Sequence, residues 1–183
     1  MRILTGKFKG KNILMPKGIR PTQNMVRKAL FDILGDLEGM SFLELFAGSG
    51  SIGFEALSRG VKDLVLVETN RDCQLAINKN IASLKVKSCV LYPGEAENSV
   101  KLLYGQNRKF DVIFLDPPYY KDMAKKILQT LSAYDILAPD GLLVAQHFKR
   151  DSMPETIEGK FKLLKRSFYG DTVLSFYDKN KGS

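Results

Sequence analysis

The 183-residue chain carries 28 basic and 20 acidic side chains, with one His, two Cys and no Trp. Its 44% hydrophobic content supports a buried core and, with 26% charged residues, excludes wholesale disorder. No run approaches the roughly 18 apolar residues of a membrane helix, and the first residues are charged where a signal peptide is apolar. We therefore expect a cytoplasmic protein with no membrane partner, and we also expect a monomer. Its length predicts a single domain, 1–183, because one core commonly spans about 100 to 200 residues.

The cysteine and histidine content does not support a metal site. Cys73 and Cys89 lack CxxC spacing, and His147 is the one histidine. We expect two ordinary thiols, in the core or at the surface. His147 is expected to pack or to lie at the surface, with a place in the lining of the functional site as the alternative.

The excess of positive charge is concentrated at one end of the chain. The first 31 residues hold eight basic side chains and no acidic one, so the remainder has 20 of each sign. Such local charge is typical of a surface that binds RNA or DNA, although a solvated basic arm has the same composition. The candidate RNA-binding residues are Arg2, Lys7, Lys9, Lys11, Arg20 and Arg27.

Residues 1–21 are expected to form a basic N-terminal hairpin or extension, and 22–183 the catalytic core. After Thr22, apolar residues recur at spacings of three and four, which predicts an amphipathic helix with Thr22 as its N-cap. Gly35 or Gly39 can end this helix.

From residue 41 onward, short apolar runs alternate with amphipathic segments of helix length. This pattern predicts an α/β, Rossmann-like fold with a mainly parallel seven-stranded sheet. Predicted strands are 42–46, 64–68, 88–92, 112–116 and 142–146, and predicted helices are 53–59, 71–84, 95–103 and 123–135. The β-type runs 161–168 and 172–177 predict a closing antiparallel hairpin.

A glycine-rich loop follows the first predicted strand. Gly48, Gly50 and Gly53 complete the pattern G-x-G-x-x-G before a helix, and Glu68 ends the second strand. Such glycines permit a tight turn close to a ligand, while the carboxylate can accept hydrogen bonds from ribose hydroxyls. The pattern fits either a dinucleotide such as NAD or the smaller adenosine cofactor S-adenosylmethionine.

Two further carboxylates favour S-adenosylmethionine. Glu44, four residues before Gly48, suits a cationic amino group better than an anionic pyrophosphate. Glu95, just beyond the third strand, can accept a hydrogen bond from an adenine amino group. The structural alternatives are a paired buried acid at Glu44 and a helix N-terminal charge at Glu95.

The fourth predicted strand runs directly into Asp116-Pro117-Pro118-Tyr119. Ligands of open α/β sheets bind at the carboxyl ends of the strands. The prolines remove two backbone donors, which leaves carbonyl oxygens beside a carboxylate, a set of acceptors that suits an amino group. The Tyr119 ring can stack on a base drawn out of its helix. A proline turn with a capping Asp is the structural alternative.

Together, 44–53 and 116–119 resemble class I S-adenosylmethionine-dependent methyltransferases that modify exocyclic amines. More closely, the chain resembles the bacterial RsmD family over nearly its whole length, through Arg20-Pro21-Thr22, Phe46 to Gly50, 55–60 and 169–172. The resemblance implies methylation of the N2 amine of one guanine in 16S ribosomal RNA, in small ribosomal subunit particles.

The resemblance also implies residue roles, with Asp116 to Tyr119 receiving the guanine. The implied cofactor-binding set is Glu44, Phe46, Ala47, Gly48, Ser49, Gly50, Glu68, Thr69, Glu95, Ala96 and Thr22. The chain departs from the family pattern at Asn24-Met25, where an acid-Arg pair is common, and at Gln146, where a Glu is common.

Other functions remain open on this sequence. Adenine-N6 methylation of DNA or RNA, or methylation of a protein glutamine, would use the same loop chemistry. An NAD-dependent oxidoreductase fits the glycine motif and Glu68, but the sequence offers no obvious hydride-transfer acid or base. A noncatalytic RNA-binding protein would not need both loops intact.

Overall fold

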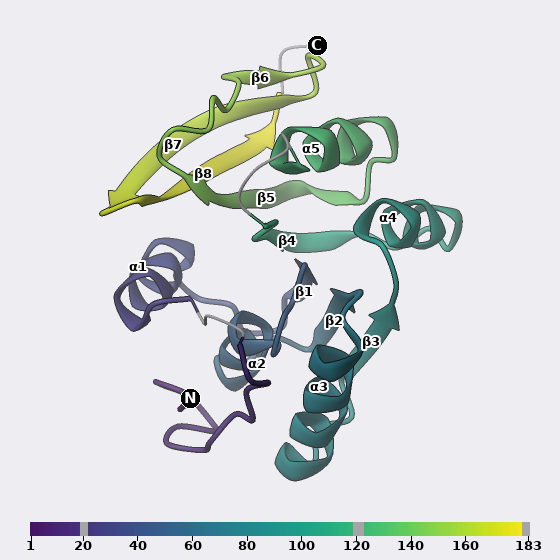
Figure 1. Cartoon of the computed structure of the whole chain (residues 1–183). Coiled ribbons are helices and arrows are strands. Elements are labelled where there is room, and N and C mark those ends of the chain that lie inside the picture. Colours follow the sequence, from purple (N-terminus) through teal and green to yellow (C-terminus); the bar gives the residue numbers. More distant parts are fainter. Residues whose placement is uncertain (19–21, 119–122, 181–183) are drawn as a thin grey trace. The chain divides into compact units, whose positions relative to one another are not determined.

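The computed structural model describes residues 1–18, 22–118 and 123–180. The chain divides into two compact units, residues 1–95 and 96–183, which are described separately (Figure 1). The prediction of a single domain stays a prediction.

The first unit contains a parallel three-stranded sheet in the order β3-β2-β1. Its strands are β1 (Ser41–Leu45), β2 (Asp63–Glu68) and β3 (Cys89–Pro93), and its helices are α1 (Asn24–Leu34), α2 (Ser51–Ser58) and α3 (Arg71–Leu84). Every residue of β1 and α2 is buried. Helix α2 packs on β1 and β2, and α3 packs on β2 and β3. The apolar runs predicted as the first two strands are therefore buried strands of a parallel sheet, whereas β3, at the end of the strand order, is partly exposed.

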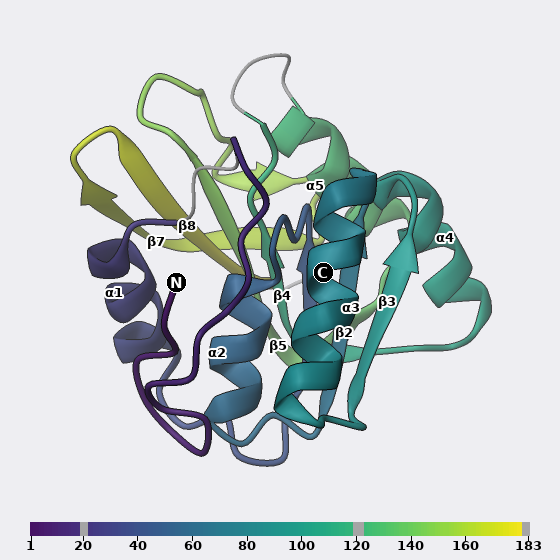
Figure 2. The same cartoon turned by 60° about the horizontal axis from the view of Figure 1, so that its bottom comes forward.

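The N-terminal extension is anchored along α2 (Figure 2). The backbone N–H groups of Leu4 and Thr5 donate to the buried Glu55 carboxylate at 2.7 and 3.1 Å. The N–H of Phe8 donates to Ser58 Oγ at 2.8 Å. Gly6 has φ 77°, and a Cβ there would overlap the Ser58 carbonyl oxygen. The predicted basic extension is thus fixed by contacts with residues about 50 positions later.

The second unit has the strand order β4-β5-β8-β7-β6. Its elements are α4 (Ala96–Gly105), β4 (Phe110–Leu115), α5 (Met123–Ala133), β5 (Leu137–Phe148), β6 (Thr156–Ile157), β7 (Phe161–Tyr169) and β8 (Thr172–Lys179). Strands β4 and β5 are parallel, and the later pairs are antiparallel. Helix α5 packs against β5 and α4.

The alternation of strands and helices confirms the predicted α/β architecture, and β7 with β8 forms the predicted hairpin. The described residues form eight strands rather than seven, since the two-residue β6 has no sequence signal of its own. Thr22 is not the N-cap of α1. The cap is Gln23, without a side-chain hydrogen bond, whereas Gly35 ends the helix with φ 73° as predicted. Among the described helices, none has the length and hydropathy of a membrane span.

Candidate functional site

The glycine loop between β1 and α2 has an unusual backbone. Phe46, Gly48 and Gly50 all have positive φ, at 61°, 56° and 75°. A Cβ on Gly50 would lie 2.8 Å from the Phe54 ring, so both its conformation and its neighbours require glycine. Positive φ at a bulky residue such as Phe46 is strained, which is typical of functional loops.

Glu68 fixes this loop to the end of β2. One carboxylate oxygen, Oε2, accepts the N–H of Gly48 at 2.6 Å, and Oε1 accepts those of Thr69 and Asn70 at 2.8 and 2.7 Å. The side chain is 8% exposed. Each carboxylate oxygen can accept about two hydrogen bonds, so Oε2 retains capacity for a further donor. The structure therefore brings Gly48 and Glu68 together and gives Glu68 a loop-holding role that the motif did not indicate.

The side chain of Glu44 lies so close to Gly53 that the third position of the motif must be glycine. Its Oε2 accepts the buried N–H of Gly53 at 2.8 Å. A Cβ on Gly53 would lie 2.8 Å from that oxygen and 2.6 Å from Leu66. Glu44 is 3% exposed, so the alternative of a buried, hydrogen-bonded acid describes this contact. Its role toward a cofactor amino group stays a prediction.

The remaining predicted cofactor residues differ in exposure. The N–H of Gly94 donates to the Glu68 carbonyl at 3.0 Å, which brings the segment before α4 to the end of β2. Glu95 follows it and is exposed, whereas Ala96, the first residue of α4, is buried. The others are buried (Ala47, Ser49), half-buried (Thr22, Phe46) or exposed (Thr69).

Asp116 lies directly after β4. It is held by Gln146, a contact that the sequence did not predict. The Nε2 of Gln146, in β5, donates to Asp116 Oδ2 at 2.8 Å. Gln146 is 5% exposed, and its Oε1 has no hydrogen-bond partner among the described residues. Pro117 is buried and Pro118 exposed, and Tyr119 lies outside the described residues.

Strand pairing gives the signal that could have revealed this contact. Leu115 pairs with Ala145 in the parallel register of β4 and β5. The next residue of each strand is Asp116 and Gln146, so their side chains project to the same side of the sheet.

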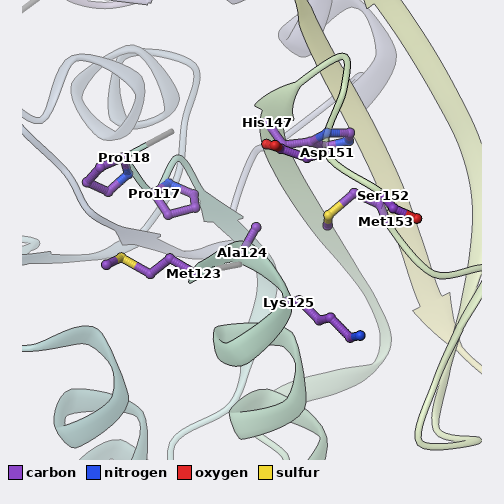
Figure 3. Close-up of a pocket in the computed structure, with 9 residues that line it drawn as sticks. All are labelled: Pro117, Pro118, Met123, Ala124, Lys125, His147, Asp151, Ser152 and Met153. Atoms are coloured by element: carbon purple, nitrogen blue, oxygen red, sulfur yellow. The ribbon is translucent and has the colours of Figure 1, made fainter. Parts of the chain in front are cut away.

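A small pocket lies beside the two prolines, between α5 and the segment that follows β5 (Figure 3). Its lining includes Pro117, Pro118 and His147. His147 Nδ1 lies 2.9 Å from the Phe148 carbonyl, which can only accept, so Nδ1 carries the proton and Nε2 accepts from the Ser175 hydroxyl at 2.8 Å. Burial lowers the pKa of His147, and its neutral ring is a packing group at the pocket wall.

The predicted RNA-binding residues fall into three groups. Arg2, Lys7, Lys9 and Lys11 are exposed on the extension. Arg27 is 0% exposed and donates to the Arg2 carbonyl at 2.8 Å, so its assignment as an RNA contact is wrong: the helix directs it inward. Burial lowers its pKa, and the charge of Glu55 opposes this. Arg20 lies outside the described residues.

Within the described ranges, no group of three or more potential metal ligands exists. Both cysteines are free and buried. Burial raises the pKa of Cys73 to about 11 and that of Cys89 to about 12, so neither is a reactive thiolate at neutral pH.

Comparisons with known proteins found a family model and relatives that match nearly the whole chain. A family model described as "Conserved hypothetical protein 95" matches residues 1–178. The chain is 33% identical to "Putative rRNA methyltransferase YlbH" of Bacillus subtilis, over 98% of this chain and 99% of that protein. It is also 33% identical to "Ribosomal RNA small subunit methyltransferase D" of Haemophilus influenzae, over 97% of this chain and 93% of that protein.

A solved structure of "Putative methyltransferase yhhF" from Escherichia coli matches with a TM-score of 0.86 and 26% identity, over 98% of both chains. The predicted Rossmann-like methyltransferase fold is therefore confirmed.

Proposed function

Because the chain belongs to the bacterial RsmD family, we propose that it transfers a methyl group from S-adenosylmethionine to the N2 amine of a guanine in 16S ribosomal RNA. The relatives named as small-subunit ribosomal RNA methyltransferases support the RNA substrate.

The observation that carries the chemical part of the proposal is the way Asp116 is held. An ionised carboxylate only accepts hydrogen bonds, and Gln146 uses its donor to orient Oδ2. The following prolines have no N–H to offer, so the chain presents acceptors at this strand end. Acceptors suit the two N–H groups of an exocyclic amine.

In the proposed reaction, Asp116 and the Pro117 carbonyl bind the guanine amine. The lone pair on N2 is delocalised into the ring, so the site must turn it toward the methyl group and stabilise the positive charge that develops on nitrogen. An adjacent carboxylate does both by position and charge. The new bond joins N2 to the methyl carbon, the sulfur leaves as a neutral thioether, and N2 then releases one proton. Tyr119 is proposed to stack on the base.

S-adenosylmethionine supplies the methyl group as a sulfonium. We assign its methionine end to Glu44 and the glycine loop, its ribose to Glu68, and its adenine to Glu95 and Ala96. The fit rests on the carboxylates: Glu68 ends β2 beside the loop, and its Oε2 can accept one further hydrogen bond, as from a ribose hydroxyl.

The RNA is proposed to bind through the exposed basic side chains of the extension, Arg2, Lys7, Lys9 and Lys11. We further propose that the protein works as a single-domain monomer in the cytoplasm, on assembled small-subunit particles.

Incubation of the protein with radiolabelled S-adenosylmethionine and unmodified small ribosomal subunits, followed by nucleoside analysis, tests donor, substrate and modified atom together. The proposal expects label in N2-methylguanosine. Label in N6-methyladenosine, or no label in RNA, would overturn it. Asp116→Ala is the matched control, because it should abolish transfer while leaving cofactor binding measurable. Thermal stabilisation by S-adenosylhomocysteine but not NAD separates this enzyme from an oxidoreductase.

A further inference from the structure

The tip of the β7–β8 hairpin carries aromatic and basic side chains that the proposed reaction does not use. Phe168, near the end of β7, is 65% exposed, and Tyr169 beside it is half-buried. Lys165 and Arg166 are exposed on the same strand, and Arg150 is exposed just after β5. Because side chains alternate along a strand, Phe168 and Arg166 project from one face of β7, and Lys165 and Tyr169 project from the other. These five residues, around the tip of the hairpin, are called the hairpin surface.

Strand pairing places the hairpin surface at the same end of the second unit's sheet as the amine-binding loop. Asp116 follows the last residue of β4, which pairs with Ala145. Three residues later in β5, Phe148 pairs with Thr172, which in turn pairs with Tyr169. With strands about 4.8 Å apart and a rise of about 3.3 Å per residue, the tip lies roughly 15 to 20 Å from Asp116. A short stretch of single-stranded RNA can cover that distance.

Protection of an exposed sheet edge explains only part of this surface. Within the described chain, β6 pairs with β7 only at Phe161 and Lys162, so the later part of β7 is an edge. Lysines and a bulge, here between Leu163 and Lys165, are common devices that discourage unwanted strand pairing. An exposed Phe168 does the opposite, because it adds apolar area to an open edge.

The charges around the tip favour a polyanion. Lys149 and Asp171 pair with each other at 2.7 Å. Asp151 accepts the N–H of Phe148 at 3.0 Å through Oδ2. Arg166 donates through Nη2 to the Met153 carbonyl at 2.7 Å. Because a guanidinium has five N–H donors, this contact fixes the side chain and leaves donors for a phosphate.

We infer that the hairpin surface binds single-stranded RNA beside the target guanine, with one flanking base stacked on Phe168 and phosphates held by the basic residues. Aromatic rings with interspersed cations form the common surface for unpaired nucleotides, since every base has a π-face. A base drawn out of its helix leaves its neighbours unstacked, and Phe168 would give one of them a new partner. This inference rests on the proposed function. It gives the protein a second RNA-binding surface, in addition to the N-terminal extension.

The test measures methylation kinetics on small ribosomal subunits for Phe168→Ala and Phe168→Tyr. Loss of the ring should raise KM about 5- to 100-fold with kcat nearly unchanged, because stacking remote from the amine binds ground and transition states alike. Phe168→Tyr keeps the π-face and should retain the wild-type KM. Leu164→Ala is the matched control, since Leu164 is also exposed on β7, at 55%, and should leave both parameters unchanged.

A third variant separates RNA from a protein partner. Phe168→Leu keeps an apolar side chain without a π-face, so an RNA contact predicts a KM like that of Phe168→Ala. A wild-type KM for Phe168→Leu would indicate an apolar protein contact and overturn the inference. If the wild type is active and Phe168→Ala has an unchanged KM, the inference about the hairpin surface is overturned and the proposed function stands. If the wild type itself is inactive, the proposed function is overturned.

Discussion

Gln146 donates its side-chain amide to Oδ2 of Asp116 at 2.8 Å, from a position that is 95% buried in β5. An amide can donate to an ionised carboxylate, whereas an ionised glutamate could not. Gln146 therefore makes a specific orienting contact with Asp116.

Gln146→Leu should lower kcat about 10- to 100-fold, because hydrogen bonds to charged groups contribute about 1.5 to 3 kcal/mol. Cofactor affinity should not change, and steady-state kinetics with cofactor titration measure both. Gln129→Leu, on the exposed side of α5, is the control. A Gln146→Leu enzyme with wild-type kcat would show that Asp116 needs no support from β5.

The main elements could be predicted because their apolar periodicity is local. Helix α3 has the predicted bounds, Arg71–Leu84. Strand β5 begins at Leu137 rather than at the predicted residue 142, because Pro139 and Gly141 interrupt the apolar run without ending the strand. Propensity identified the strand, and pairing with β4 extended it.

The contacts that depend on distant residues could not be predicted. The sequence gives no sign that Glu55 would accept the N–H of Leu4, 51 residues earlier. The sequence places Arg27 with the basic residues of the surface, because its charge can be read from the sequence and its burial cannot. The same reason applies to Gln146, because its contact with Asp116 follows from the pairing of β4 with β5, which the sequence does not show.

The basic side chains of the extension should bind RNA through its charge. Replacing Lys7, Lys9 and Lys11 by Ala should weaken binding most at low salt, because each phosphate contact adds about 0.7 to 0.9 to the slope of log affinity against log salt. Filter binding at several ionic strengths should show the slope fall by about 2 to 3. Cofactor affinity should stay unchanged, and an unaltered slope would mean that RNA does not bind here.

Gly6 should be required for docking of the extension on α2. Gly6 and Gly10 both have positive φ, at 77° and 80°, but only a Cβ on Gly6 meets another group, the Ser58 carbonyl. Both alanine variants suffer about 1 to 2 kcal/mol of left-handed strain. Gly6→Ala should lower the free energy of unfolding by about 1 to 3 kcal/mol more, through overpacking.

Limited proteolysis distinguishes the two variants. Gly6→Ala should expose residues 1–15 to rapid cleavage, and Gly10→Ala should not. Equal cleavage would show that the contact with Ser58 does not hold the extension.

His147 should make the protein less stable in mild acid. Burial lowers its folded-state pKa below the ordinary value of about 6.5, with Asp151 and Arg166 acting in opposite directions. The unfolded chain therefore binds a proton more readily, so the stability contributed by the neutral ring is present above pH 6.5 and is lost as pH falls toward the folded pKa. Carboxylates act at lower pH. Burial opposes ionisation of Asp135, but the hydrogen bond and charge of Lys179, the charge of Lys109 and the N–H of Leu137 together outweigh it and lower the pKa of Asp135.

Denaturant unfolding between pH 7.5 and 5 measures this effect, which can be assigned because the chain has one histidine. Wild-type stability should fall across this range. His147→Asn should lower stability at pH 7.5, because the ring loses its contacts with Phe148 and Ser175, but should flatten the dependence on pH. An equally steep dependence in the variant would show that another group titrates, and that His147 is not the source of acid sensitivity.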